Sequence, residues 1–263
     1  MRQKLVIAIL GALILGAFAS LSFFSSPVSA TMRLRIEDLS NGGDVGAVIT
    51  DNGPGDINPL VGALTFSGQV GSFLVNVTTG LSKPIVGGSD LGQIDLNSVN
   101  VLTSGAGTLR LTLEDTGYLA GPGTTSNLLG TVGGTLTAPA GSTITIQSWA
   151  NGGNLVPDLG PDQIGSLGPI GGNPPPGSVP AWPAAFVSGP GAFSSSSSGD
   201  FNNGTDDTFS LFAQVDVNFA GVGSVSFDEN QRAVPEPASL LLLGAGAAGL
   251  GLLAGRKRQR RNS

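Results

Sequence analysis

The sequence predicts an all-β body, folded as a β-sandwich or jelly roll, between two apolar terminal segments. Short runs of the body alternate apolar and polar residues, as strands with one buried face do. Glycine is abundant, with 42 residues in a chain of 263, and many of these glycines stand in turn-like clusters. No long 3.6-residue periodicity appears between the two ends, which disfavours α/β folds.

Residues 1–30 have the layout of a secretory signal peptide. Arg2 and Lys4 give a positively charged start, and residues 5–18 are apolar. Val28, Ser29 and Ala30 then supply small residues where signal peptidase cuts, so we expect cleavage after Ala30. The alternative is an uncleaved membrane anchor.

Residues 31–233 form the predicted β-rich body, which is long enough for one domain with its own core. The clearest alternation lies at 109–114, 143–147 and 209–219, where Phe209, Leu211, Ala213, Val215, Val217 and Phe219 occupy every second position. Further strands are expected at 32–39, 45–50, 73–78, 92–101, 127–136 and 225–227. Turn signals such as Asn41-Gly42-Gly43 separate them.

Residues 151–200 stand apart in composition. Proline and glycine crowd together, including Pro174-Pro175-Pro176, and five serines follow at 194–198. This composition predicts a long loop or a partly flexible connection between strands. Trp182 and Phe186 are expected to tether it to the body, or else to mark an exposed contact site.

One acidic loop is a candidate cation site. Asp51, Asp56 and Asn58 place oxygen atoms among turn residues, which suits Ca²⁺, although the EF-hand spacing is not met. A second acidic cluster lies at 200–207. The alternative for both is Asx-turn chemistry, in which the side chains bond their own backbone. Calcium is therefore a candidate ligand, and no other cofactor is expected.

The C-terminal segment, residues 234–261, has three parts in order. Pro235, Glu236 and Pro237 come first, and the prolines favour an extended chain there. Residues 238–255 are uncharged and span roughly 27 Å as a helix, enough to cross a membrane. A basic stop follows that should remain cytoplasmic; its residues are Arg256, Lys257, Arg258, Arg260 and Arg261.

This tail resembles the PEP-CTERM sorting signal of bacterial envelope proteins. Such tails are also labelled an ice-binding protein C-terminal domain, a name that implies no ice binding here. The resemblance implies anchorage in the cytoplasmic membrane, cleavage near the motif by an exosortase, and delivery to the cell surface or extracellular matrix. The alternative is an ordinary C-terminal membrane anchor.

Charge and composition exclude several function classes for the body. Five basic and 17 acidic side chains in residues 31–233 leave a net charge of −12. Nucleic-acid binding is not expected, because phosphate contacts need clustered Lys and Arg. The chain has no cysteine, so an exported body must be stabilised without disulfides.

Catalytic constellations are missing from the sequence. Without histidine, neither a Ser-His-Asp arrangement nor a His-ligated zinc site can form. No serine fits the G-x-S-x-G pattern. Two-carboxylate hydrolysis is the chemistry that these exclusions leave open. We therefore expect the protein not to be an enzyme.

Two function classes fit the sequence. The first is a non-catalytic exported surface or extracellular-matrix protein, sorted through its tail, with signal peptidase and an exosortase as processing partners. The second is a carbohydrate- or ligand-binding adhesion module, with calcium as a candidate ligand. Exopolysaccharide is a candidate partner in both.

Overall fold

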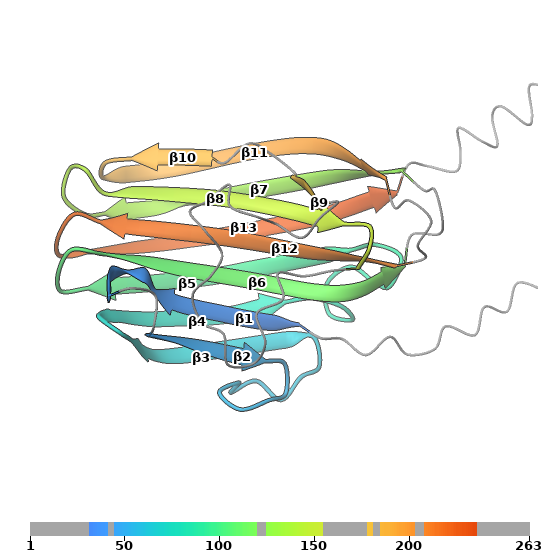
Figure 1. Cartoon of the computed structure of the whole chain (residues 1–263), viewed down its shortest axis with the longest axis horizontal. Coiled ribbons are helices and arrows are strands. Elements are labelled where there is room, and N and C mark those ends of the chain that lie inside the picture. The colour runs from blue at the N-terminus through green and yellow to red at the C-terminus, as the bar shows by residue number, and fades with distance from the viewer. Residues whose placement is uncertain are drawn as a thin grey trace, which may run out of the picture.

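The body is a sandwich of two antiparallel sheets (Figure 1). The computed structural model describes residues 32–41, 45–119, 125–154, 178–180, 185–202 and 208–235. One sheet has seven strands in the order β10-β8-β12-β6-β1-β2, with β9 paired to β8. The other has six strands in the order β11-β7-β13-β5-β4-β3. The prediction of an all-β sandwich is confirmed for these residues.

The seven-stranded sheet contains β1 (Arg33–Asp38), β2 (Val45–Thr50), β6 (Gly107–Leu119), β8 (Thr143–Asn151), β9 (Ser178–Pro180), β10 (Ala185–Ser188) and β12 (Thr208–Phe219). The six-stranded sheet contains β3 (Ala63–Val70), β4 (Phe73–Leu81), β5 (Gln93–Thr103), β7 (Thr125–Thr137), β11 (Gly191–Asn202) and β13 (Gly223–Pro235). A short 3-10 helix, η1 (Leu39–Asn41), follows β1.

The core lies between the two sheets and explains the alternation. Leu111 and Leu113 of β6 and Val75 and Val77 of β4 come from opposite sheets and belong to one continuous apolar cluster of fully buried side chains. Full burial of each such side chain stabilises the fold by about 1.5–3 kcal/mol. All six alternating residues of β12 belong to this cluster, as the pattern predicts.

The sequence missed β3. Its residues 65–69 have mixed polarity and lie mostly on the surface, and its pairing with β4 shifts register between Leu64 and Phe66. Only the ends of the strand, Ala63–Leu64 and Val70, are buried. A strand that is apolar at its ends and interrupted by a bulge gives no clear period-two signal.

The expectation of a loop over residues 151–200 is corrected in part, because the described residues of that stretch include three strands. Residues 178–180, 185–188 and 191–202 are strands, and the serines 194–198 pair with β7 from Gly133 to Leu129. Serine is not enriched in strands, so β11 has little intrinsic signal. Its register with β7 holds it in the sheet. Phe186 lies in β10, and Trp182 lies outside the described residues.

One end of the sandwich gathers the features relevant to function. There β13 ends at Pro235, and there β2 and β4 also end, so the β2–β3 loop (51–62) and the β4–β5 loop (82–92) begin there. We call this the tail end. The β2–β3 loop turns back along the edge formed by β2 and β3 (Figure 1). No helix of the described part is both long and apolar enough for a membrane span. The predicted span 238–255 lies outside that part, as does the predicted signal peptide.

Candidate functional site

The predicted sorting motif joins the folded body without a linker. Pro235 is the last residue of β13 and pairs with Ser126 of β7, one step after Val234 pairs with Asn127. Ala233 is buried, and its N–H donates to the carbonyl of Gly92 at 2.8 Å. Since β13 lies between β7 and β5 in mid-sheet, the chain is firmly held up to the motif itself.

The two tail-end loops are bonded to each other as well as to β13. The Ser82 N–H donates to the Gly62 carbonyl at 2.9 Å, which joins the β4–β5 loop to the β2–β3 loop. Gly62 has a positive φ of 83°, and a Cβ there would meet Lys83 and Pro84 at 2.8–2.9 Å. Glycine is therefore needed for this close approach.

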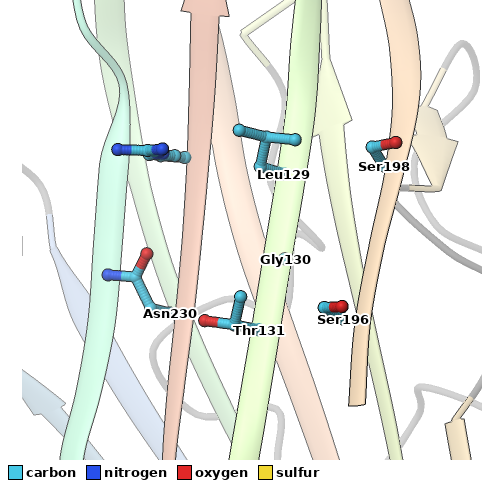
Figure 2. Close-up of a pocket in the computed structure, with 7 residues that line it drawn as sticks. Leu129, Gly130, Thr131, Ser196, Ser198 and Asn230 are labelled. Atoms are coloured by element: carbon cyan, nitrogen blue, oxygen red, sulfur yellow. The ribbon is translucent and has the colours of Figure 1, made fainter.

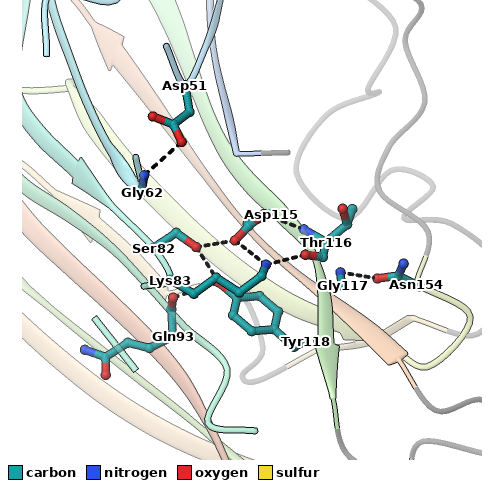
Figure 3. Close-up of polar contacts among 10 residues, drawn as sticks. All are labelled: Asp51, Gly62, Ser82, Lys83, Gln93, Asp115, Thr116, Gly117, Tyr118 and Asn154. Atoms are coloured by element: carbon teal, nitrogen blue, oxygen red, sulfur yellow. Dashed lines mark hydrogen bonds and ion pairs between the residues drawn. The ribbon is translucent and has the colours of Figure 1, made fainter. Parts of the chain in front are cut away.

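A buried polar network fixes the β4–β5 loop to β6 (Figure 3). The Lys83 ammonium donates to Asp115 Oδ2 at 2.8 Å and to the Thr116 carbonyl. Its Nζ also lies 4.0 Å from the centre of the Tyr118 ring, a cation–π contact. Ser82 bonds both Asp115 and the Tyr118 hydroxyl, which donates to the Gln93 carbonyl at 2.8 Å.

Burial governs the electrostatics of this network. It lowers the pKa of Lys83, and the charge of Asp115 opposes that shift. It also raises the pKa of Tyr118 well above the ordinary value, with Asp115 acting in the same direction. Ser82 and Asp115 are themselves fully buried. The network is therefore closed to solvent, and its arrangement suits structural support of the loop.

In the candidate calcium loop, carboxylate oxygens accept bonds from the loop's own backbone. Asp56 accepts from the N–H groups of Asn52, Asn58 and Thr65 at 2.9–3.0 Å. Asp51 accepts from the Gly62 N–H at 2.8 Å, and burial raises its pKa. Asn58 accepts from the Leu60 N–H at 3.1 Å. These are the Asx-turn contacts named as the alternative to calcium.

Within the described ranges, no three acidic side chains come close enough to hold a metal ion. In the second acidic cluster, Asp200 accepts from Asn127 Nδ2 at 3.0 Å, and Asn202 lies at the end of β11. Residues 203–207 are outside the described part. Calcium binding stays a prediction at both places.

Polar groups also bridge the two sheets inside the core. Glu229 of β13 accepts a hydrogen bond from Ser148 of β8 at 3.0 Å, and Gln231 donates to the Trp149 carbonyl at 2.8 Å. Burial raises the pKa of Glu229 to about 8, with Asp95 adding to the rise. The carboxyl group is therefore largely protonated at neutral pH. Sequence reasoning missed this residue, because a glutamate in an alternating run is normally placed outward.

The outward-directed side of the seven-stranded sheet carries buried ion pairs. Arg33 and Arg35 contact the two oxygens of Glu114, each at 2.6 Å. Arg110 holds Asp216 through two bonds of 2.7–2.8 Å. These pairs join β1 to β6 and β6 to β12, so they fix the strand order.

An aromatic pair lies on the same side of that sheet. Trp149 of β8 stacks on Phe212 of β12 with ring centres 5.0 Å apart and an interplanar angle of 19°. Both are buried, yet neither belongs to the core cluster between the sheets. Being buried, the pair contributes packing rather than an open aromatic platform.

The open side of the six-stranded sheet carries a shallow polar groove (Figure 2). A hollow of about 540 Å³ lies over β11, β7 and β13. A second of about 480 Å³ adjoins it toward β5, sharing Thr131 and Asn230. Hydroxyl and amide side chains supply most polar groups of the first hollow, which is lined by Leu129, Gly130, Thr131, Ser196, Ser198, Asn230 and Arg232.

Charge is divided along this groove. Arg232 lies in the first hollow, while Asp95 and Asp228 lie in the second. Burial raises the pKa of Asp95, and the charge of Asp228 adds to the rise. Asp228 also accepts from the Ser98 N–H at 2.5 Å. Gly133 contributes no side chain between these groups, which leaves the hollow open.

Most of the remaining predicted site residues lie outside the described part of the chain. Of the sorting motif, Pro235 closes β13, and Glu236 and Pro237 lie outside the described residues. So do Ala30 and the basic stop of Arg256, Lys257, Arg258, Arg260 and Arg261. The structure shows that the motif follows β13 directly, which could not be predicted from the sequence.

Comparison with known families identifies the tail. Residues 233–260 match the model of the PEP-CTERM protein-sorting motif, so the C-terminal segment carries this motif. The match begins at Ala233, inside β13. It confirms the resemblance of the C-terminal segment. No curated protein matches the chain.

Three solved structures show weak likeness to the chain. TmCBM61 in complex with β-1,4-galactotriose has 10% identity and a TM-score of 0.27, over 62% of this chain and 88% of that one. A structure from work on the promiscuous specificity of carbohydrate-binding modules from the β-sandwich superfamily has 12% identity and a TM-score of 0.26, over 76% of this chain and 72% of that one. The K1 cleaved adhesin domain of Lys-gingipain from Porphyromonas gingivalis W83 has 13% identity and a TM-score of 0.23, over 65% of this chain and 96% of that one. TM-scores this low support no argument about function.

Proposed function

We propose that this protein is a non-catalytic surface or extracellular-matrix protein. It is exported, held in the cytoplasmic membrane by its tail, and cut by an exosortase near Pro235–Glu236–Pro237. The observation that carries the proposal is the sorting motif at residues 233–260, placed directly at the end of a mid-sheet strand. The last strand of the body thus ends at the first residue of the Pro235–Glu236–Pro237 triplet.

The intact mass of the protein recovered from its native host tests this proposal. We expect a product that begins at Thr31 and ends near residues 235–237. A product that begins at Thr31 and still carries Arg261 would make the tail a plain anchor and overturn the processing step. As a matched control, replacing Pro235, Glu236 and Pro237 by alanine should give the uncut, membrane-bound form.

The polar groove favours a second candidate function, binding of a neutral carbohydrate. Sugar hydroxyl groups both donate and accept hydrogen bonds, and Thr131, Ser196 and Asn230 offer both kinds of partner side by side. A neutral glycan also suits a body of net charge −12, which would repel a polyanion.

A glycan array probed with and without calcium tests binding by the mature protein. Asn230→Ala should reduce any signal at least several-fold, because it removes both amide partners from the shared part of the groove. Gln69→Ala, on the exposed part of β3, is the matched control and should bind like the wild type. A flat array in both conditions would exclude this second function.

The same material tests the non-catalytic assignment. Asp95 and Asp228 are two carboxyl groups in one groove, the type of pair that glycoside hydrolysis requires. We expect no release of reducing sugar from polysaccharides. Release that disappears in both Asp95→Asn and Asp228→Asn would make the protein a hydrolase and contradict the proposal.

A further inference from the structure

We propose that the tail end of the sandwich rests on the lipid surface of the membrane that anchors the tail. The contact is made by exposed aliphatic side chains of the two tail-end loops. It rests on the proposed function, since it requires the tail to be inserted, and it adds a defined orientation of the body before cleavage.

The first argument is the distance between body and membrane. Pro235 is fixed in β13, and the apolar run begins at Ala238. Three residue steps reach at most about 10 Å. The headgroup layer of one leaflet is itself roughly 5–8 Å thick. A body tied so closely cannot stand clear of the membrane, and the end that bears Pro235 must face it.

The second argument is where the exposed apolar side chains lie. Ile57, Leu60 and Val61 of the β2–β3 loop have side chains that are 57–67% exposed to solvent. Ile85 and Leu91 of the β4–β5 loop are 37–44% exposed. These five are among the eight large exposed aliphatic side chains of the described residues, and their loops follow β2 and β4, which end on the same side of the sandwich as β13. Exposed apolar patches of this kind mark interaction surfaces.

The third argument is rigidity. The hydrogen bonds from Ala233 to Gly92 and from Ser82 to Gly62 connect β13 to both loops in turn. The Lys83–Asp115 pair then holds the β4–β5 loop on β6 (Figure 3). The aliphatic side chains therefore keep a fixed position relative to the start of the tail. Lipid is favoured over water as their neighbour because apolar transfer stabilises the contact.

The chain lacks cysteine, so a single introduced thiol gives a unique probe site. The full chain with Leu60→Cys is labelled with an environment-sensitive fluorophore and reconstituted into phosphatidylcholine vesicles. Some vesicles contain lipids with a nitroxide quencher near the headgroups. The matched control is Val222→Cys in the β12–β13 turn at the opposite end, which is 68% exposed.

We expect the nitroxide lipids to quench the probe at position 60 by at least twofold and to leave the probe at 222 unchanged. A chain that floats with the vesicles but shows no quenching at 60, or equal quenching at both sites, would overturn the contact. Quenching that appears only after an exosortase is added would assign the loops to the enzyme instead. A chain that does not float would overturn the anchor, and with it the proposed function.

A second variant checks that the quenching does not come from the fluorophore itself inserting into the lipid. With the probe at Ile85→Cys, changing Leu60 and Val61 to serine should lower the quenching, because two aliphatic contacts are lost. Unchanged quenching at 85 would contradict a role for these side chains. Because both positions are exposed, the fold should survive these changes.

Discussion

At the scale of single residues, Glu229 couples the stability of the sandwich to pH. Its carboxyl group lies between the sheets with one hydrogen bond, from Ser148, and its pKa is raised to about 8. In the unfolded chain it would ionise near its ordinary value of 4.5. Between these two values the unfolded state releases a proton that the folded state keeps.

The free energy of unfolding should therefore fall as pH rises from about 4.5 to 8, and this loss is complete above 8. Glu229→Gln removes the titration and should flatten that part of the profile. Denaturant unfolding at several pH values measures the effect. The control, Asp200→Asn, removes an exposed carboxylate and should keep the wild-type slope. A slope unchanged in Glu229→Gln would show that the group is ionised in the fold.

Gly134 of β7 shows a different constraint at the residue scale. A Cβ there would overlap the Ser226 carbonyl oxygen and approach Phe193 and Phe227 at 2.7 Å. Gly134→Ala should cost about 1–3 kcal/mol of unfolding free energy through overpacking. Gly105→Ala in the β5–β6 turn is the matched control, because nothing lies within 4 Å of its added Cβ. Thermal unfolding of both variants checks this, and equal melting temperatures would refute it.

At the scale of elements, the β4–β5 loop depends on the Lys83–Asp115 pair. Lys83→Met leaves the buried Asp115 without its cation and should cost about 3 kcal/mol. Adding Asp115→Asn should restore part of the loss, because the uncompensated charge disappears. Arg232→Met, which removes an exposed cation, is the control and should change stability by less than about 0.5 kcal/mol. A denaturant-based double-mutant cycle measures the coupling, and additive effects would mean that the pair is not coupled.

Elements differ in how well the sequence predicts them, and burial explains the difference. The strand at 209–219 was predicted because one face enters the core and the period of two is complete. Strand β11 was missed because a run of serines has no alternation of apolar and polar residues and because its place depends on β7. The tail was predictable because its motif is local. Contacts such as Arg35 to Glu114 join residues 79 positions apart, and no local pattern encodes them.

At the scale of the whole molecule, the proposed removal of the tail requires that the body stays folded without it. The sorting motif begins inside β13, which pairs with both β7 and β5 and supplies Val225, Phe227 and Ala233 to the core. A cut after Pro235 leaves all of these contacts. A cut within β13 would leave β7 and β5 each with an unpaired edge in mid-sheet and open the core.

Two truncated chains test this division between body and tail. A chain that stops after Pro235 should fold and unfold cooperatively, because every strand of both sheets is retained. A chain that stops after Gly221 loses β13, and with it several buried side chains worth about 1.5–3 kcal/mol each. Domain stabilities are only about 5–15 kcal/mol, so the shorter chain should not fold. Circular dichroism and thermal melting distinguish the two. A cooperative transition in the shorter chain would show that β13 is dispensable, and the cleavage position would then be free of the structural constraint inferred here.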